Sequence, residues 1–121
     1  MFWRSNRRNE RDAIWYNRGQ GGNWTGDQPV TPDEEADSEK PFVLEDHEGT
    51  LWAFFLSTKD SEGLDIWYTR FPREANDWEA ETHRVTTAEN EDILAVVAVE
   101  DPQGDIWVFW HSNKIGVGDA I

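Results

Sequence analysis

The sequence predicts an all-β protein built from a repeated unit of short antiparallel strands, and two observations carry this prediction. Residues 41–55 and 96–110 match almost position for position, and five matched pairs share a spacing of 55 residues: Glu45/Glu100, Asp46/Asp101, Gly49/Gly104, Trp52/Trp107 and Phe54/Phe109. Each stretch joins two apolar runs through Glu-Asp-x-x-Gly, which is typical of a β-hairpin whose glycine takes the positive φ of the turn. No stretch shows the periodicity of an amphipathic helix.

The strands expected along the chain follow this repeat. Runs rich in aromatic and β-branched residues favour strands, and Gly, Asp and Asn between them favour turns. A Gly-rich turn is expected at 19–24, and acidic loops are expected at 32–40 and 87–92. The strands are expected at 2–5, 13–18, 30–31, 42–45, 50–57, 64–70, about 82–87, 96–100 and 105–112.

Composition limits what the repeat can build. The 121 residues have room for one domain. A hydrophobic content of 37% and a mean hydropathy of -0.80 are low, yet eight Trp are too many for a disordered chain. The apolar material is therefore concentrated at particular positions.

Charge and cysteine content exclude several classes of function. A net charge of -14 argues against nucleic acid as a partner, since phosphate binding needs clustered Lys and Arg, and it disfavours an anionic membrane surface in the same way. The chain has no Cys, so it can form neither disulfides nor a thiolate metal site. No apolar run approaches the ~20 residues that span a bilayer.

Four antiparallel strands in 52 to 55 residues are typical of a β-propeller blade. We therefore expect a single domain over residues 1–121, forming a partial propeller of about two blades that is incomplete at both ends. Its repeat units are expected at about 2–53 and 54–108, with a partial third unit at 109–121. The expected partners of such a piece are other copies of the chain or further blades.

The order of the elements resembles the blades of sialidase-like (BNR-repeat) propellers over essentially the whole chain. In that family the turn between the third and fourth strands carries the Asp-box, Ser-x-Asp-x-Gly-x-x-Trp. Residues 17–24 and 73–78 occupy this place here and keep only the Trp, together with glycines in the first copy. The resemblance is thus to the blade architecture, with a degenerate box.

The resemblance implies that a catalytic relative would use an arginine triad, a Tyr nucleophile paired with a Glu, and an Asp acid. The Arg-Ile-Pro motif that supplies the first arginine is missing. Tyr16 and Tyr68 are the only tyrosines and share one phase of the repeat, which favours a packing role. We therefore expect a non-enzymatic recognition or scaffold module whose ligand is a carbohydrate or a protein. The alternative is a fragment of a sialidase-like glycoside hydrolase.

Metal binding has little support in the sequence. His47, His83 and His111 are dispersed and lack the spacing of metal ligands. The acidic stretch 87–92 has oxygen ligands suited to calcium but lacks the Asp-x-Asp-x-Asp-Gly spacing of a calcium loop. We expect no cofactor, and calcium stays an open alternative.

Residues that recur in phase are expected to form the structural core, and Trp107 is expected to be buried against a neighbouring blade. These core positions are Trp15, Trp52, Trp67, Trp107, Tyr16, Tyr68, Gly49 and Gly104. Unrepeated charged residues in the loops that would line the functional face are the candidate binding residues. They are Arg7, Arg8, Arg11, Asp33, Glu34, Asp60, Glu62, Glu89 and Asp92.

Overall fold

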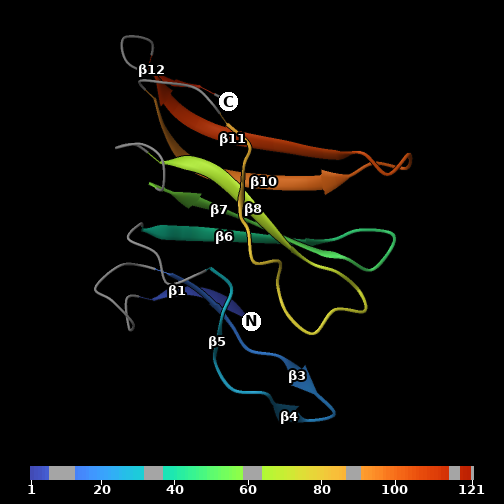
Figure 1. The fold of residues 1–121 in the computed structure, drawn as a ribbon. Helices are drawn as coiled ribbons and strands as arrows, with labels where there is room; N and C mark the ends of the chain where they lie inside the picture. Colours follow the sequence, from blue (N-terminus) through green and yellow to red (C-terminus); the bar gives the residue numbers. More distant parts are fainter. Residues whose placement is uncertain (6–12, 32–36, 59–63, 87–90, 115–117, 121) are drawn as a thin grey trace.

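The computed structural model describes residues 1–5, 13–31, 37–58, 64–86, 91–114 and 118–120. Within these ranges the chain is all-β and antiparallel, without any helix, as the sequence predicts. Three sheets follow one another along the chain and stack in that order (Figure 1).

Sheet 1 is three-stranded, in the order β1-β2-β5. It consists of β1 (Phe2–Ser5), β2 (Ala13–Tyr16) and β5 (Gln28–Pro29). The turn between β2 and β5 contains a separate small hairpin, made of β3 (Gly19–Gln20) and β4 (Asn23–Trp24). This hairpin lies on the far side of sheet 1 from the other sheets (Figure 1).

Sheets 2 and 3 contain the longer strands. Sheet 2 has the order β6-β7-β8-β9, with β6 (Ser38–Glu45), β7 (Leu51–Ser57), β8 (Asp65–Phe71) and β9 (His83–Arg84). Sheet 3 has the order β10-β11-β12, with β10 (Glu91–Glu100), β11 (Ile106–Lys114) and β12 (Gly118–Ala120). Sequential strands are therefore neighbours in every sheet, as in a meander.

The three sheets share one register. Phe2 pairs with Tyr16 in sheet 1 as Phe54 pairs with Tyr68 in sheet 2. Sheets 2 and 3 agree in the same way at an offset of 55 residues, since the pairs Leu44–Trp52 and Val99–Trp107 correspond. The spacing that is visible in the sequence is thus a spacing of equivalent positions in space.

The fourth strand of the repeat differs slightly from its expected position in the first copy only. It lies at 28–29, two residues before the expected 30–31, whereas in the second copy it lies at 83–84, within the expected 82–87. Thr31 Oγ1 accepts the Ile14 N–H at 3.0 Å, and Thr86 Oγ1 accepts the Ile66 N–H at 3.0 Å. The ladder ends there because a hydroxyl takes the place of a backbone carbonyl.

The first strand of the repeat is longer than expected. β6 and β10 begin at Ser38 and Glu91, inside stretches that their acidic composition assigned to loops. A bulge between Glu39 and Phe42 lets β6 continue, and Lys40 takes a φ of 52° within it. A bulge absorbs extra residues without ending the pairing, so charge alone does not mark the strand boundary.

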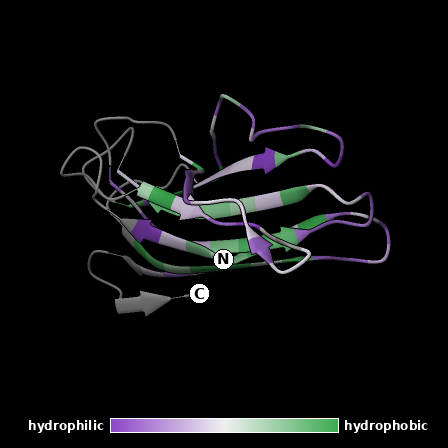
Figure 2. Ribbon diagram, turned by 90° about the horizontal axis from the view of Figure 1, so that it is seen from below, coloured by the Kyte–Doolittle hydropathy of each residue, from purple (hydrophilic) through white to green (hydrophobic). Residues whose placement is uncertain are grey.

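The core consists of two layers, one on each face of sheet 2. Successive side chains of β7 alternate between them: Ala53 and Phe55 face sheet 1, and Phe54 and Leu56 face sheet 3. The first cluster joins Ile14 and Val30 to these residues, and the second adds Ile66, Ile93, Val96 and Ala98. Figure 2 shows the apolar colour along the strands and the polar colour in the connecting turns.

Candidate ligand-binding cleft

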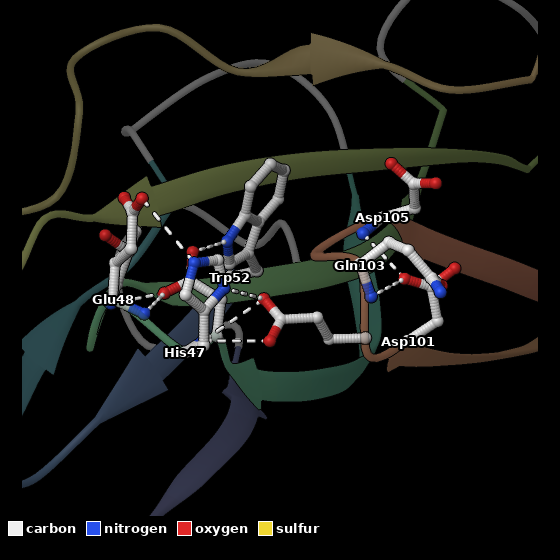
Figure 3. A network of polar contacts seen from close by, with 9 residues as sticks. His47, Glu48, Trp52, Asp101, Gln103 and Asp105 are labelled. Carbon is white, nitrogen blue, oxygen red and sulfur yellow. Dashed lines mark hydrogen bonds and ion pairs between the residues drawn. The ribbon is translucent and has the colours of Figure 1, made fainter.

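The turn between β6 and β7, residues 45–50, is organised by one carboxylate, that of Asp46. Its Oδ1 accepts the backbone N–H groups of Glu48 and Thr50, both at 2.9 Å. Its Oδ2 accepts the indole N–H of Trp52 at 3.0 Å, which fixes the ring beside the turn (Figure 3). Burial disfavours the charged form of Asp46, but these three hydrogen bonds outweigh it and lower the pKa of the carboxyl.

The turn between β10 and β11, residues 100–105, repeats this arrangement. Asp101 Oδ1 accepts the N–H groups of Gln103 and Asp105, both at 2.9 Å, and its Oδ2 accepts the Trp107 indole at 2.8 Å. The Trp107 hydrogen bond, followed by the one from Asp105, lowers the pKa of Asp101. Below, these are called the first Asp turn (45–50) and the second Asp turn (100–105).

Glycine is required at the same point of both Asp turns. Gly49 has a φ of 84° and Gly104 a φ of 90°, a region that side chains with a Cβ rarely adopt. Gly49 also lies beneath the side chain of Arg73, whose Cδ would be 3.0 Å from a Cβ at this position. The backbone conformation of the two Asp turns therefore requires glycine at positions 49 and 104, where a structural role is expected.

A contact between the two Asp turns joins sheets 2 and 3. Glu100 accepts the backbone N–H of His47 through Oε1 at 2.9 Å, and its Oε2 lies 3.1 Å from the imidazole Nδ1. The hydrogen bond and charge of Glu100 raise the pKa of His47, with a smaller contribution from Glu48, whose Oε1 is 3.7 Å from Nε2 (Figure 3). Pro102 occupies the position equivalent to His47 in the second Asp turn, so that turn has neither the N–H nor the imidazole.

A cleft of about 660 Å³ lies between sheets 1 and 2, beside the first Asp turn. This volume lies in the usual range of small-molecule sites. Its lining is contributed by the start of sheet 1, the turn that follows β2, the first Asp turn and the turn that follows β8. The lining residues are Met1, Phe2, Tyr16, Asn17, Arg18, Gly19, Glu45, Asp46, His47, Gly49, Leu51, Phe71, Arg73 and Trp78.

Aromatic rings form the apolar part of the cleft. Trp78 packs edge-on against Tyr16 and Phe2, each with ring centroids 5.9 Å apart, and against Phe71 at 5.5 Å. Trp78 is only 8% exposed, although it belongs to a turn of sheet 2, because it leans onto sheet 1. Burial first, and then the charge of Asp77, raises the pKa of Tyr16, while Arg18 acts in the opposite sense.

Charged groups stand at the rim of the cleft. Arg18 and Arg73 are both exposed, and neither forms an ion pair with a described residue. Glu45 is also exposed, and the other carboxylate of the rim, Asp46, is held by the turn. The cleft therefore offers guanidinium donors and carboxylate acceptors around an aromatic wall.

None of the candidate binding residues named from the sequence is among the described residues that line this cleft. Asp92 pairs with Asn113 through its backbone, and its side chain lies outside the described part of the chain. The other eight also lie outside the described residues: Arg7, Arg8, Arg11, Asp33, Glu34, Asp60, Glu62 and Glu89. Residues 87–90 of the stretch considered for calcium, 87–92, also lie outside the described residues, and the side chains of 91 and 92 are not described.

The aromatic core positions divide into three groups. Trp15 and Trp67 are buried, at 6% and 4% exposure. Trp52, Tyr16 and Tyr68 are partly buried. The expected burial of Trp107 is wrong for this chain, since the residue is 54% exposed, because no described sheet covers the face on which it lies.

Sequence reasoning missed the cleft because it forms between sheets. Arg18 and Arg73 lie in the two copies of the degenerate box, to which the sequence assigns no binding role, and the spacing of His47 bears only on metal binding. The repeated Trp at the end of each box was the available signal, since Trp78 forms the aromatic wall. Among the described residues, no group of three or more His, Asp or Glu is placed to hold a metal ion, and no helix is long and apolar enough to cross a membrane.

No protein-family model, no curated protein and no solved structure matches the chain.

Proposed function

We propose that the chain is a non-enzymatic recognition module built from β-propeller-type blades, and that it binds carbohydrate in the cleft between sheets 1 and 2. What supports the blade architecture is the shared register of three antiparallel sheets that stack face to face. The resemblance to sialidase-like blades rests on the same elements and on the Trp of the degenerate box. Trp78 packs against the sheet before its own, as an inter-blade contact does.

The composition of the cleft supports a carbohydrate ligand. Tyr and Trp rings present flat apolar surfaces against which a sugar face can stack. Arg18, Arg73 and Glu45 at the rim supply donors and acceptors for hydroxyl groups, and the two guanidinium groups also suit a sugar carboxylate. The observation that carries the proposal is the combination of an aromatic wall with two exposed arginines that form no ion pair with a described residue.

The environment of Tyr16 argues against the alternative, a glycoside hydrolase fragment. Burial raises the pKa of its hydroxyl, so the group stays protonated near neutral pH, whereas a nucleophile needs an adjacent base or a lowered pKa. The ring of Tyr16 also packs on Phe2 and Trp78, in a position that Tyr68 repeats in sheet 2. Both properties fit a packing role that contributes to a binding wall.

Isothermal titration calorimetry of the purified chain with 3′-sialyllactose and with lactose tests the proposal. We expect measurable binding of at least one of the sugars, weakened about tenfold or more by Arg73→Ala or Arg18→Ala. Glu74→Ala is the matched control, because Glu74 is exposed next to Arg73 but does not line the cleft. Absence of heat with both sugars contradicts carbohydrate binding in the cleft.

An activity assay separates the two functions. Incubation with a fluorogenic sialic-acid glycoside is expected to release no fluorophore above a buffer blank. Release that Tyr16→Phe abolishes, in a variant that keeps its circular dichroism spectrum, favours the glycoside hydrolase instead.

A further inference from the structure

Five of the six exposed large apolar side chains among the described residues lie at the two ends of the sheet stack. Four of them lie on the face of sheet 3 that points away from sheet 2: Val97, Val99, Trp107 and Phe109, between 47% and 54% exposed. These four are called the β10–β11 face. The fifth, Trp24 at 62%, belongs to the β3–β4 hairpin at the other end. The sixth, Met1 at 74%, lines the cleft between sheets 1 and 2.

The β10–β11 face repeats a surface that is covered elsewhere in the same chain. The equivalent side chains of sheet 2, 55 residues earlier, are Phe42, Leu44, Trp52 and Phe54, and all four pack in the second core cluster against sheet 3. The rings have the same arrangement: Trp52 and Phe54 stack at 6.2 Å and 10°, and Trp107 and Phe109 stack at 6.4 Å and 13°. Sheet 3 thus exposes a face whose counterpart on sheet 2 is covered by another sheet.

The opposite end carries the matching element. Trp78 leans from sheet 2 onto Phe2 of sheet 1, with ring centroids 5.9 Å apart and planes at 83°. Trp24 is the equivalent of Trp78, because Thr25 N–H bonds to Arg18 O just as Glu79 N–H bonds to Arg70 O. Phe109 is the equivalent of Phe2 in sheet 3. Trp24 and Phe109 therefore correspond to the two halves of a contact that the described residues form once, between Trp78 and Phe2, and both are exposed.

Charge distribution favours a second copy as the partner over an unrelated protein. Residues 1–18 contain five Arg and two acidic residues, whereas residues 97–121 contain four acidic residues and one Lys. The first segment of the sequence is thus basic and the last acidic, in a chain whose net charge is -14. Opposite charges orient an end-to-end encounter, even though two whole chains repel each other at long range.

We propose that a second copy of the chain docks head to tail, with its sheet 1 over the β10–β11 face and its Trp24 against Phe109. The contact joins two different surfaces, so it is heterologous and extends into a ring or an open chain of copies. The argument for it does not rest on carbohydrate binding, since the lining residues of the cleft come from sheets 1 and 2 of a single copy.

Sedimentation and light scattering over a range of protein concentrations test the docking. We expect the wild-type mass to rise above that of the monomer with concentration. Trp24→Ser and Phe109→Ser are each expected to weaken association about tenfold or more, as the loss of a central aromatic contact does. Asn76→Ser is the matched control, since Asn76 is an exposed residue in the turn that follows β8 of sheet 2 and belongs to neither proposed docking surface.

Mixing the two variants gives the decisive readout. Each variant keeps one intact end, so an equimolar mixture is expected to form a 1:1 dimer at a concentration at which each variant alone is mostly monomeric. Both replaced side chains are exposed, and an unchanged circular dichroism spectrum and thermal midpoint show that the variants fold. A wild-type monomer at all concentrations, variants that associate as the wild type does, or a mixture that stays monomeric overturns the proposal.

Discussion

The hairpins of the two Asp turns have the same local structure in different surroundings. In each, an aspartate accepts two backbone N–H groups and one indole N–H at nearly identical distances. Yet Trp52 is partly buried, whereas Trp107 is 54% exposed. The difference comes from the neighbours: Tyr68 lies 5.2 Å from the Trp52 ring, Arg70 also lies over it at 5.2 Å, and sheet 3 covers this face of sheet 2.

This comparison separates two sources of stability. The hydrogen bonds of a turn follow from residues within a few positions of one another, so both hairpins form them. Burial follows from sheets that are distant in sequence, so only the first hairpin has it. If equivalent residues of the two hairpins are substituted, the difference between the losses in unfolding free energy therefore measures how much packing between sheets stabilises the first hairpin.

The largest expected difference is between Phe54→Ala and Phe109→Ala. Phe54 is 1% exposed and packs in the second core cluster, so its truncation should lower the free energy of unfolding by about 3 to 5 kcal/mol. Phe109 is 47% exposed, and its truncation should cost less than about 1 kcal/mol in the dilute chain. Urea denaturation at low protein concentration measures both values, and equal losses would show that Phe109 is covered too.

The sequence was enough to predict what the two hairpins share. The repeated Glu-Asp-x-x-Gly predicted both turns, both glycines with positive φ and the all-β class, because these depend on local residue types. Apolar runs also placed the longer strands, although β6 and β10 begin inside acidic sequence and β5 lies two residues before its expected position. They did not indicate β3 and β4, which form within the expected Gly-rich turn.

What could not be predicted depends on which sheet covers which face. The contact between His47 and Glu100 joins residues 53 apart, and nothing in either turn signals it. Trp78 and Trp24 share a place in the repeat, yet one is buried and the other is 62% exposed. The position of a residue in the repeat identifies its equivalents in the other sheets. Only the order in which the sheets stack shows which of these equivalents a neighbouring sheet covers.

A smaller effect is expected from removing the carboxylate of the first Asp turn. Asp46→Ala leaves two backbone N–H groups and the Trp52 indole without their acceptor, and it should cost about 1 to 3 kcal/mol. Asp101→Ala should cost less, because water replaces the lost acceptor more easily around the exposed Trp107. Thermal denaturation of the two variants at one pH gives the comparison, and a larger loss for Asp101→Ala would contradict it.

The smallest expected effect is a pH dependence that only the first hairpin has. Glu100 raises the pKa of His47 above its unfolded value of about 6.5, whereas Pro102 in the second hairpin has no titratable group. A raised pKa means that the folded state favours the imidazolium, so this stabilisation is fully present below the unfolded pKa. It is lost as the pH rises through the folded pKa. The lowered pKa values of Asp46 and Asp101 act near pH 4 and below, outside this window.

His47→Gln isolates the contribution of the imidazolium, because the variant keeps the backbone N–H that Glu100 accepts. The thermal midpoint of the wild type should exceed that of His47→Gln by more at pH 5.5 than at pH 8.5. Glu100→Gln serves as the control background, in which most of this pH dependence should disappear because the principal partner of the imidazolium has lost its charge. A midpoint difference that is constant from pH 5.5 to 8.5, or that grows with pH, would show that the His47–Glu100 pair does not link the two hairpins through charge.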